Sequence, residues 1–131
     1  MDARAGRTDL DAPDGAGERI VRLGAVGSTN AIAAEAAAAG EAGPVWFVVE
    51  RQTAGRGRRG RSWVSEPGNL YASFAFPVTV PADAFAFLPL TAAVALREAV
   101  LGATGLAADL KWPNDLLLAG RKVAGILVEC E

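Results

Sequence analysis

A mixed α/β fold, with a mixed β-sheet flanked by helices, is the architecture that the sequence predicts. An alanine-rich helical segment at 31–39 precedes two strand segments, an apolar run at 45–49 and a period-two alternation at 70–76. A second helical segment at 90–101 is followed by short apolar segments separated by turn residues, the first turn lying at 113–115. We therefore expect two helices among about six strands, several of them joined as hairpins.

The first four elements are a strand, a helix and two strands, expected at 20–23, 31–39, 45–49 and 70–76. Either Ser28 or Thr29 can cap the helix, because a short side-chain oxygen accepts from the unpaired backbone N–H groups of a first turn. Gly40 ends the helix, because glycine adopts the left-handed conformation after a last turn without steric cost. The strand at 45–49 then leads into a loop rich in arginine and glycine.

The second helix is expected over 90–101, with Pro89 in its first turn and Gly102 at its end. Three strand segments follow it, at 106–112, 116–118 and 123–129. The last of them is apolar on both faces, so we expect it to be buried beside a further strand. Because the sequence stops at Glu131, we expect that it is truncated at the C-terminus.

The composition fits one domain behind a short leader. A chain of 131 residues suffices for one hydrophobic core. Large apolar side chains are almost missing from the start of the chain, so we expect a disordered leader at 1–18 and an ordered domain over 19–131. The chain has no histidine and one cysteine, Cys130, which excludes imidazole catalysis, internal disulfides and the common zinc sites. We expect no dedicated metal site in the protein.

Neither a signal peptide nor a membrane span is expected. The leader lacks the apolar run of a signal peptide. The most apolar stretch, 82–101, is interrupted by a proline and by charged residues, namely Asp83, Pro89, Arg97 and Glu98. These features favour a cytoplasmic protein.

The most informative segment is the arginine loop, which we define as residues 55–63. Five of the 13 basic residues lie within residues 51–61, although the net charge of the whole chain is −2. Glycines let the backbone approach a bound group closely, and arginine forks bind carboxylate and phosphate. Because such a loop cannot bury a core of its own, we expect it to be mobile until an anion binds. A solvated basic loop is the plainer alternative.

A dinucleotide-binding fold is a further alternative, since residues 55–60 match the Gly-x-Gly-x-x-Gly pattern. That motif needs a helix to open at its third glycine, and Pro67 and Gly68 would break a helix here. The sequence also lacks an acidic residue at the position that would bind the ribose, and it lacks the Gly-Lys-Ser/Thr of a P-loop. Both nucleotide-binding motifs are therefore disfavoured.

Three further motifs place polar groups at the ends of helices and strands. Ser-Thr-Asn at 28–30 precedes the first helix, where a plain helix cap is the alternative reading. Lys-Trp-Pro-Asn-Asp at 111–115 brings a cation, an amide and a carboxylate together, and turn chemistry explains only part of it. Lys122 begins a buried strand, and Gly125 inside that strand marks a close backbone approach by a ligand. The chain's two lysines both fall in these motifs.

Taken in order, these motifs resemble those of the biotin–protein ligases. The series is Ser-Thr-Asn, Glu-x-Gln-x-Ala-Gly-Arg-Gly-Arg-Arg-Gly-Arg-x-Trp, Gly-Asn-Leu-Tyr-x-Ser, Lys-Trp-Pro-Asn-Asp and Lys-x-Ala-Gly-Ile-Leu-Val-Glu. The resemblance implies a catalytic domain with a fold similar to class II aminoacyl-tRNA synthetases and biotin–lipoate ligases. It implies that biotin is activated by ATP, with Mg²⁺, as biotinyl-5′-AMP. The biotinyl group would then be transferred to one lysine of a biotin carboxyl carrier protein of acetyl-CoA carboxylase or a related carboxylase.

The resemblance also implies roles for single residues, carried over position by position. Biotin binding falls to Ser28, Thr29, Asn30, Gln52, Arg56, Gly57, Arg58 and Lys122. Nucleotide and adenylate binding falls to Gly55, Arg56, Arg58, Arg61, Trp63, Lys111, Asn114 and Gly125. The catalytic residues would be Arg58, Lys111, Asp115 and Lys122.

The chain departs from the fuller pattern of the ligases at both ends. We expect no N-terminal DNA-binding domain, because residues 1–18 leave no room for one, and no small C-terminal domain. Specific DNA binding is not expected at an isoelectric point of about 5.2. Two alternatives stay open, a lipoate–protein ligase-like enzyme and a truncated biotin-binding module with little turnover, and a homodimer stays open as well.

Overall fold

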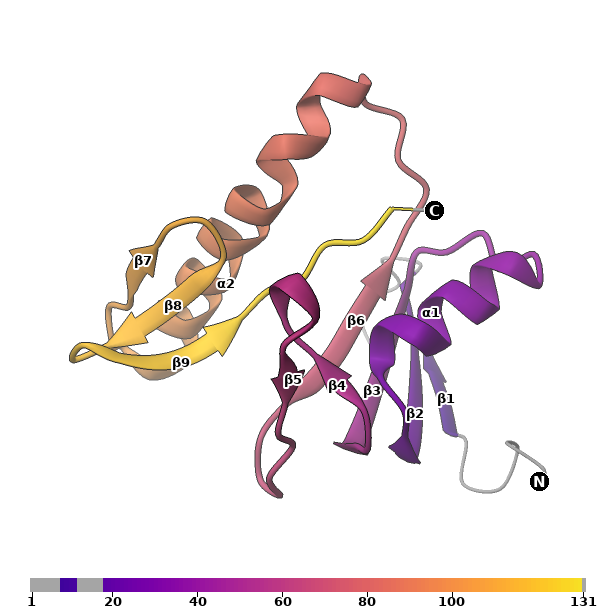
Figure 1. Cartoon of the computed structure of the whole chain (residues 1–131), viewed down its shortest axis with the longest axis horizontal. Coiled ribbons are helices and arrows are strands. Elements are labelled where there is room, and N and C mark those ends of the chain that lie inside the picture. Colours follow the sequence, from indigo (N-terminus) through magenta and orange to yellow (C-terminus); the bar gives the residue numbers. More distant parts are fainter. Residues whose placement is uncertain (1–7, 12–17, 131) are drawn as a thin grey trace. The chain divides into compact units, whose positions relative to one another are not determined.

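The computed structural model describes residues 8–11 and 18–130. Between Val78 and Thr79 the chain divides into two compact units, which we call unit 1 and unit 2 and describe separately (Figure 1). The prediction of one catalytic domain over 19–131 concerns both units together and stays a prediction.

Unit 1 contains a four-stranded mixed sheet in the order β1-β2-β3-β6. Its strands are β1 (Thr8–Asp11), β2 (Arg19–Val26), β3 (Val45–Gln52) and β6 (Tyr71–Ala75). β2 pairs parallel to β3, and the other two pairings are antiparallel. The parallel pair is joined through the helix α1 (Thr29–Ala38), as parallel strands need a crossover connection. The predicted mixed sheet, with strands and a helix at the expected places, is confirmed.

The core of unit 1 lies between α1 and one face of the sheet (Figure 1). Side chains alternate along a strand, so Val45 and Phe47 of β3 point to the same face, where both are buried beside Val21 of β2. The partly buried residues Ile32 and Ala36 of α1 pack on these three. Helix α1 ends as predicted, because Gly40 follows its last turn with a left-handed φ of 96°.

Strand β1 corrects the prediction of a disordered leader. Residues 8–11 pair antiparallel with β2, from Thr8 opposite Arg22 to Asp11 opposite Arg19. An edge strand takes its backbone hydrogen bonds from a sheet that other residues have built, so its own composition need not be apolar. The rest of the predicted leader, 1–7 and 12–17, lies outside the described residues.

The arginine loop contains a short hairpin. Strand β4 (Gly55–Arg56) pairs antiparallel with β5 (Ser62–Trp63), and a 3₁₀ turn, η1 (Arg58–Gly60), joins them. The Gly57 N–H donates to the Arg61 carbonyl at 2.7 Å. The sequence predicted a loop with no such pairing, because its composition offers no hydrophobic residues before Trp63. Its mobility before an anion binds stays a prediction.

Unit 2 packs a helix on a three-stranded antiparallel sheet in the order β7-β8-β9. Its elements are η2 (Ala82–Phe87), α2 (Leu88–Thr104), β7 (Asp109–Lys111), β8 (Asp115–Leu118) and β9 (Arg121–Gly125). Ala93 of α2, Ala108 and Leu116 form its buried core. The helix continues past Gly102, the predicted end, to a left-handed Gly105 with φ 73°. A single glycine inside a helix costs only about 1 kcal/mol, which the packing of α2 overrides.

Strand β9 corrects two expectations. It ends at Gly125 and does not run over 123–129, and Val123 is 49% exposed where both faces were expected to be buried. Within the described residues β9 has one neighbouring strand, β8. The backbone of Ile126 leaves the ladder and bonds to Asn114, whose carbonyl accepts from the Ile126 N–H at 2.9 Å. The apolar composition of 123–129 therefore predicted a buried strand, whereas the sheet of unit 2 leaves Val123 exposed.

One helical stretch in the described part of the chain, Ala82–Thr104, is long and apolar enough to cross a membrane by length and composition alone. These two criteria do not separate a membrane span from a core helix of a globular protein. In its most apolar window, 6% is buried inside this structure. Arg97 of α2 contacts the segment that follows the helix, its Nε donating to the Ala108 carbonyl at 3.0 Å.

Candidate functional site

Helix α1 is capped at its N-terminus by the side chain of Ser28. Ser28 has an extended backbone, and its Oγ accepts from the Ala31 N–H at 3.0 Å, as an N-cap residue does. The Ser28 carbonyl accepts from the Ile32 N–H at 3.2 Å. Ser28 is 5% exposed. The predicted helix cap is confirmed, and it places the two residues that follow Ser28 at the rim of the sheet.

Thr29 and Gln52 meet because of the parallel pairing of β2 and β3. Val26 lies opposite Gln52, so the end of β3 stands beside the point where the chain enters α1. The Thr29 N–H and the Thr29 hydroxyl both donate to Gln52 Oε1, at 2.9 and 3.2 Å. Two donors on one oxygen fix the orientation of the Gln52 amide.

Ser73 joins this group, and it was missing from the predicted site. It lies on β6 opposite Phe47 and is 8% exposed. Its Oγ lies 2.7 Å from Thr29 Oγ1, and it is also hydrogen-bonded to Asn30 Oδ1. The signal was present in the sequence, since Ser73 ends the Gly-Asn-Leu-Tyr-x-Ser motif and, two positions after the buried Tyr71, lies on the same face of the strand. We call the group of Ser28, Thr29, Asn30, Gln52 and Ser73 the polar cluster.

The arginine loop begins directly beside the polar cluster. Gly55 is buried, and a Cβ atom at this position would lie 2.8 Å from the Trp63 carbonyl oxygen and 2.9 Å from Gln52 Nε2. Such distances leave no room for any side chain. Gly55 therefore allows Gln52 and the returning strand β5 to approach the same point of the backbone.

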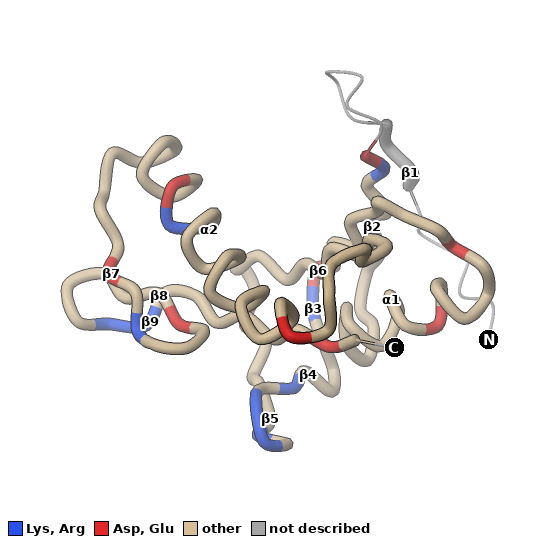
Figure 2. Tube along the Cα trace, turned by 90° about the horizontal axis from the view of Figure 1, so that it is seen from above, with Lys and Arg blue, Asp and Glu red and all other residues tan. Residues whose placement is uncertain are grey.

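The arginines of this loop are exposed to solvent. Figure 2 shows the basic positions on the hairpin of β4 and β5, and the residues are Arg56, Arg58, Arg59 and Arg61. Arg59 has a positive φ of 58°, a conformation that costs a residue with a Cβ about 1–2 kcal/mol. Trp63, to which the resemblance assigns nucleotide and adenylate binding, is 36% exposed. The chemistry available here is a set of exposed arginine residues next to a buried neutral cluster.

In unit 2, three predicted site residues lie side by side across the sheet. Lys111 of β7 is opposite Asp115 of β8, and Asp115 is opposite Gly125 of β9. Lys122 Nζ forms an ion pair with Asp115 Oδ1 at 2.9 Å, with side chains 41% and 18% exposed. Gly125 is the last residue of β9 and not an interior one, which corrects its predicted place.

Asn114 has a structural contact in this unit. Its Nδ2 donates to the Ile126 carbonyl at 2.8 Å, while its own carbonyl accepts from the Ile126 N–H. The pair imitates one rung of a β-ladder just beyond the end of β9. The predicted contact of Asn114 with a nucleotide stays a prediction.

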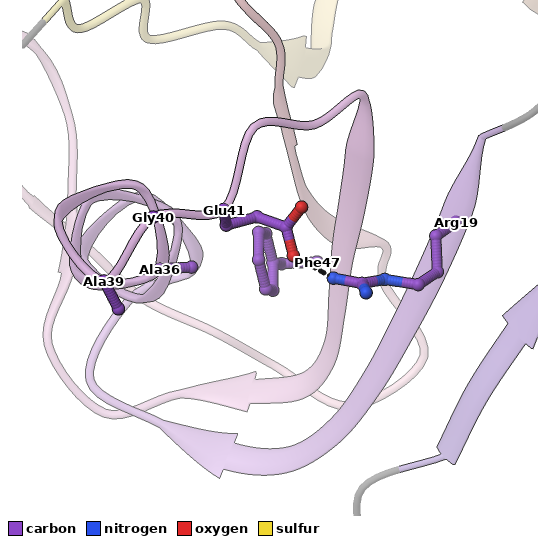
Figure 3. Close-up of a pocket in the computed structure, with 6 residues that line it drawn as sticks. All are labelled: Arg19, Ala36, Ala39, Gly40, Glu41 and Phe47. Atoms are coloured by element: carbon purple, nitrogen blue, oxygen red, sulfur yellow. Dashed lines mark hydrogen bonds and ion pairs between the residues drawn. The ribbon is translucent and has the colours of Figure 1, made fainter.

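A shallow cavity of about 390 Å³ lies elsewhere in unit 1, beside the C-terminal end of α1 (Figure 3). Arg19 of β2 forms an ion pair with Glu41 across it, in front of the Phe47 ring. Helix α1 is ten residues long, so its two ends are separated by about 15 Å. The cavity is therefore not part of the polar cluster.

Among the described residues, no group of three or more Asp, Glu, Cys or His side chains is placed to hold a metal ion.

Comparison with known proteins identifies what the chain is similar to. Residues 28–130 match the family model described as "Biotin/lipoate A/B protein ligase family", and this range includes every predicted site residue. A biotin–[acetyl-CoA-carboxylase] ligase of Paracoccus denitrificans is 49% identical over 104 residues, which are 78% of this chain and 43% of that protein. The chain thus spans less than half the length of this curated relative.

Two solved structures are similar along most of the chain. The biotin protein ligase of Leishmania major in complex with biotinyl-5-AMP has a TM-score of 0.75 and 32% identity, covering 86% of this chain and 52% of that one. The biotin protein ligase of Aquifex aeolicus in complex with biotin and ATP has a TM-score of 0.71 and 34% identity. It covers 85% of this chain and 46% of that one.

Proposed function

Because this chain belongs to the Biotin/lipoate A/B protein ligase family, we propose that it carries the catalytic residues of an ATP-dependent biotin–protein ligase. The observation that carries the proposal is the contact between a buried neutral cluster and a loop of exposed arginines at Gly55. Biotin has the same two parts, a neutral ureido ring and a carboxylate at the end of a chain. The two relatives of known structure bind biotin with ATP or as biotinyl-5-AMP, which supports the same ligand here.

We propose the following chemistry. A biotin carboxylate oxygen attacks the α-phosphorus of ATP and forms biotinyl-5′-AMP, and pyrophosphate leaves. The amine of one carrier-protein lysine then attacks the acyl carbon, AMP leaves, and an amide bond remains. The first step brings two anions together, the carboxylate and the α-phosphate, so fixed positive charge stabilises the charge on the phosphorus oxygens in the transition state. Mg²⁺ enters with ATP as part of that substrate.

The role proposed for each residue follows from the chemistry of its side chain or backbone. Ser28, Thr29, Asn30 and Gln52 are proposed for the biotin ring, and Ser73 is added to them from its contacts. Arg56, Gly57, Arg58 and Arg61 are proposed for the carboxylate and phosphate. In unit 2, the proposed groups for the nucleotide and the reacting anions are Lys111, Asn114, Asp115, Lys122 and Gly125.

The acceptor is proposed to be the biotin carboxyl carrier domain of a carboxylase in the cytoplasm, because the Paracoccus relative is named for acetyl-CoA carboxylase. We propose no specific DNA partner, and a homodimer stays an open option. Hydrolysis of an acyl-adenylate competes with transfer, so the ordering of the arginine loop over the intermediate would protect it from water.

Lys122 gives the sharpest test of the proposal. Lys122→Ala should lower biotin-dependent exchange of pyrophosphate into ATP by about 100- to 1,000-fold, because it removes a cation from the charged transition state. The matched control is Arg121→Ala, which removes an exposed positive charge from the preceding residue of the same strand and has no proposed role.

Equal exchange rates in these two variants would contradict the role of Lys122. The same assay with lipoate in place of biotin separates the two branches of the family. Activity with lipoate and none with biotin would overturn the proposed substrate.

A further inference from the structure

The sheet of unit 2 has one charged face. Residues that pair across neighbouring strands lie on the same face of a sheet, and so do residues two positions apart in one strand. Asp115 of β8 is opposite Lys111 of β7. Lys122 of β9 is opposite Leu117, two positions after Asp115. The three charged side chains therefore lie on one face, and the fully buried core residue Leu116 lies on the other.

A β-bulge in β9 sets this arrangement. The neighbours Leu116 and Leu117 of β8 pair with residues 124 and 122 of β9, so Val123 is an extra residue between two paired ones. Val123 is accordingly exposed. The two-residue turn at 119–120, where both φ angles are positive, fixes the register on one side of the bulge. On the other side, each residue of β8 pairs one position further along β9 than it would in a regular hairpin.

The bulge brings Gly125 opposite Asp115, where a regular hairpin would bring Ala124. Because glycine has no side chain, the diagonal neighbour Lys122 reaches the carboxylate without a competing side chain on that strand. Lys122 Nζ lies 2.9 Å from Asp115 Oδ1. That oxygen is buried and forms no hydrogen bond with another group that the structure describes. The ion pair with Lys122 therefore offsets the loss of water from this oxygen.

The charge of Asp115 does not suit direct contact with the proposed ligands. The biotin carboxylate and the phosphates of ATP are anions, so a carboxylate beside them repels them. A lysine ammonium attracts these anions, but a long side chain loses much rotamer freedom when it is fixed. An ion pair that already holds the ammonium reduces this loss at the moment of binding. The two residues thus suit different tasks, since Lys122 can contact the anions and Asp115 can hold Lys122.

We propose that Asp115 is a positioning residue, which acts on the reaction only through Lys122. Its ion pair, which depends on the bulge at Val123, holds the Lys122 ammonium on the charged face before biotin and ATP bind. This inference rests on the proposed function and assigns Asp115 a task within it. Lys122 has a further interaction besides this ion pair. The proposal therefore concerns the part of its order that Asp115 provides.

The variant that tests this role is Asp115→Asn, which keeps the shape of the side chain and removes its charge. In biotin-dependent exchange of pyrophosphate into ATP by the full chain, we expect kcat to fall by about 10- to 100-fold, because a displaced group lowers rates on this scale. KM for ATP should not rise, because a negative charge has been removed. A kcat within about twofold of the parent would overturn the proposal. A KM for ATP raised about tenfold would also overturn it, since it would indicate that Asp115 binds the Mg²⁺ that enters with ATP.

A double-mutant cycle shows whether the effect passes through Lys122. In a Lys122→Ala background, Asp115→Asn should change the exchange rate by less than about twofold, because the ion pair is already missing. The same should hold for transfer from preformed biotinyl-5′-AMP to the carrier protein. A loss of transfer of equal size with and without Lys122 would contradict the proposal, and would show that Asp115 takes up the proton that the acceptor amine releases. The matched control is Asp109→Asn, which removes the same charge from an exposed position on the same face and should leave both rates unchanged.

A measurement without ligand tests the ion pair itself. The chain has two lysines, so ¹³C labelling of lysine Cε gives two NMR signals, and Lys111→Arg assigns them. The order parameter of the Lys122 Cε group should be about twofold higher in the parent than in Asp115→Asn, and unchanged in Asp109→Asn. Equal order in the parent and in Asp115→Asn would contradict the inference. If the parent shows no exchange with biotin, the proposed function fails, and this measurement still decides whether Asp115 holds Lys122.

Discussion

The polar cluster and the arginine loop are neighbours in unit 1, yet they are built in opposite ways. The cluster is neutral, mostly buried and hydrogen-bonded within itself, and it stands on a helix and two strands. The loop is charged and exposed, and it includes one arginine with a positive φ. Gly55 follows Gln52 in the chain with only two residues between them. A neutral ring can be bound by hydrogen-bonding side chains that are already in position before the ligand arrives. Exposed guanidinium groups, in contrast, bind water until an anion replaces it.

Among substitutions in these two regions of unit 1, the largest effect should come from the loop. Arg58→Ala removes charge-assisted bonds to phosphate that are worth about 1.5–3 kcal/mol, so biotinyl-5′-AMP should dissociate about 10- to 100-fold faster. The melting temperature should not change, because Arg58 is exposed. Stopped-flow or filter-binding measurement of adenylate release gives the rate. A variant that retains the adenylate as long as the parent does would show that the loop's charge is not used.

The boundary between the two regions is the next target. Gly55→Ala would place a Cβ 2.8 Å from the Trp63 carbonyl, and overpacking of this kind costs about 1–3 kcal/mol. We expect a lower free energy of unfolding and weaker biotin binding together, measured by urea denaturation and calorimetry.

Gly57→Ala is the matched control for the loss of stability only, because Gly57 is itself proposed to bind the carboxylate and phosphate. Its φ is −106°, and an added Cβ would meet the nearest atoms at 3.6 Å, an ordinary contact. If Gly55→Ala were as stable as Gly57→Ala, the close approach of Gln52 and Trp63 to Gly55 would not hold.

Two serines whose hydroxyl groups differ in their partners, Ser73 of the polar cluster and Ser65 outside it, should behave differently. Ser73→Ala removes a hydroxyl that bonds to Thr29, which should cost about 0.5–1.5 kcal/mol of stability. Ser65 Oγ is buried and has no hydrogen-bond partner among the described residues, so Ser65→Ala should be neutral or slightly stabilising. Thermal denaturation of the two variants makes the comparison. Equal losses would mean that the hydrogen bonds of Ser73 add nothing to stability.

The smallest effect should be in the loop backbone. Arg59→Gly removes the cost of a left-handed residue, whereas Arg58→Gly adds only the flexibility of glycine to a right-handed turn. We expect Arg59→Gly to be the more stable of the two by about 1 kcal/mol, measured by chemical denaturation. The opposite order would indicate that Arg59 does not hold the positive φ in solution.

Periodicity and capping predicted the main elements of the fold. The strands around 45–49 and 70–76 and the helix capped by Ser28 lie where the sequence placed them, because these signals are local. Strand β1 and the early end of β9 could not be predicted in this way. The first depends on a neighbouring strand, and the second on the bond between Asn114 and Ile126.

The candidate site was predicted as a set of residues but not as a geometry. The motif at 28–30 and Gln52 indicated polar groups, and the parallel pairing of β2 with β3 brings them into contact. Ser73 was overlooked because its partner Thr29 lies 44 positions away in the chain. A sequence motif in one segment does not show which residues of a distant segment its side chains will contact.

If Ser73 lies in the biotin site as proposed, the register of β3 and β6 makes biotin binding a test of correct strand pairing. Ser73 stands opposite Phe47, and side chains alternate between the two faces of a sheet. A slip by one residue would carry Ser73 to the other face, away from Thr29, while much of the apolar content of the sheet stayed in place. A misfolded chain of this kind would be compact and yet unable to bind. Ligand present during refolding would therefore act as a selector, because it stabilises only the population whose strands are paired correctly.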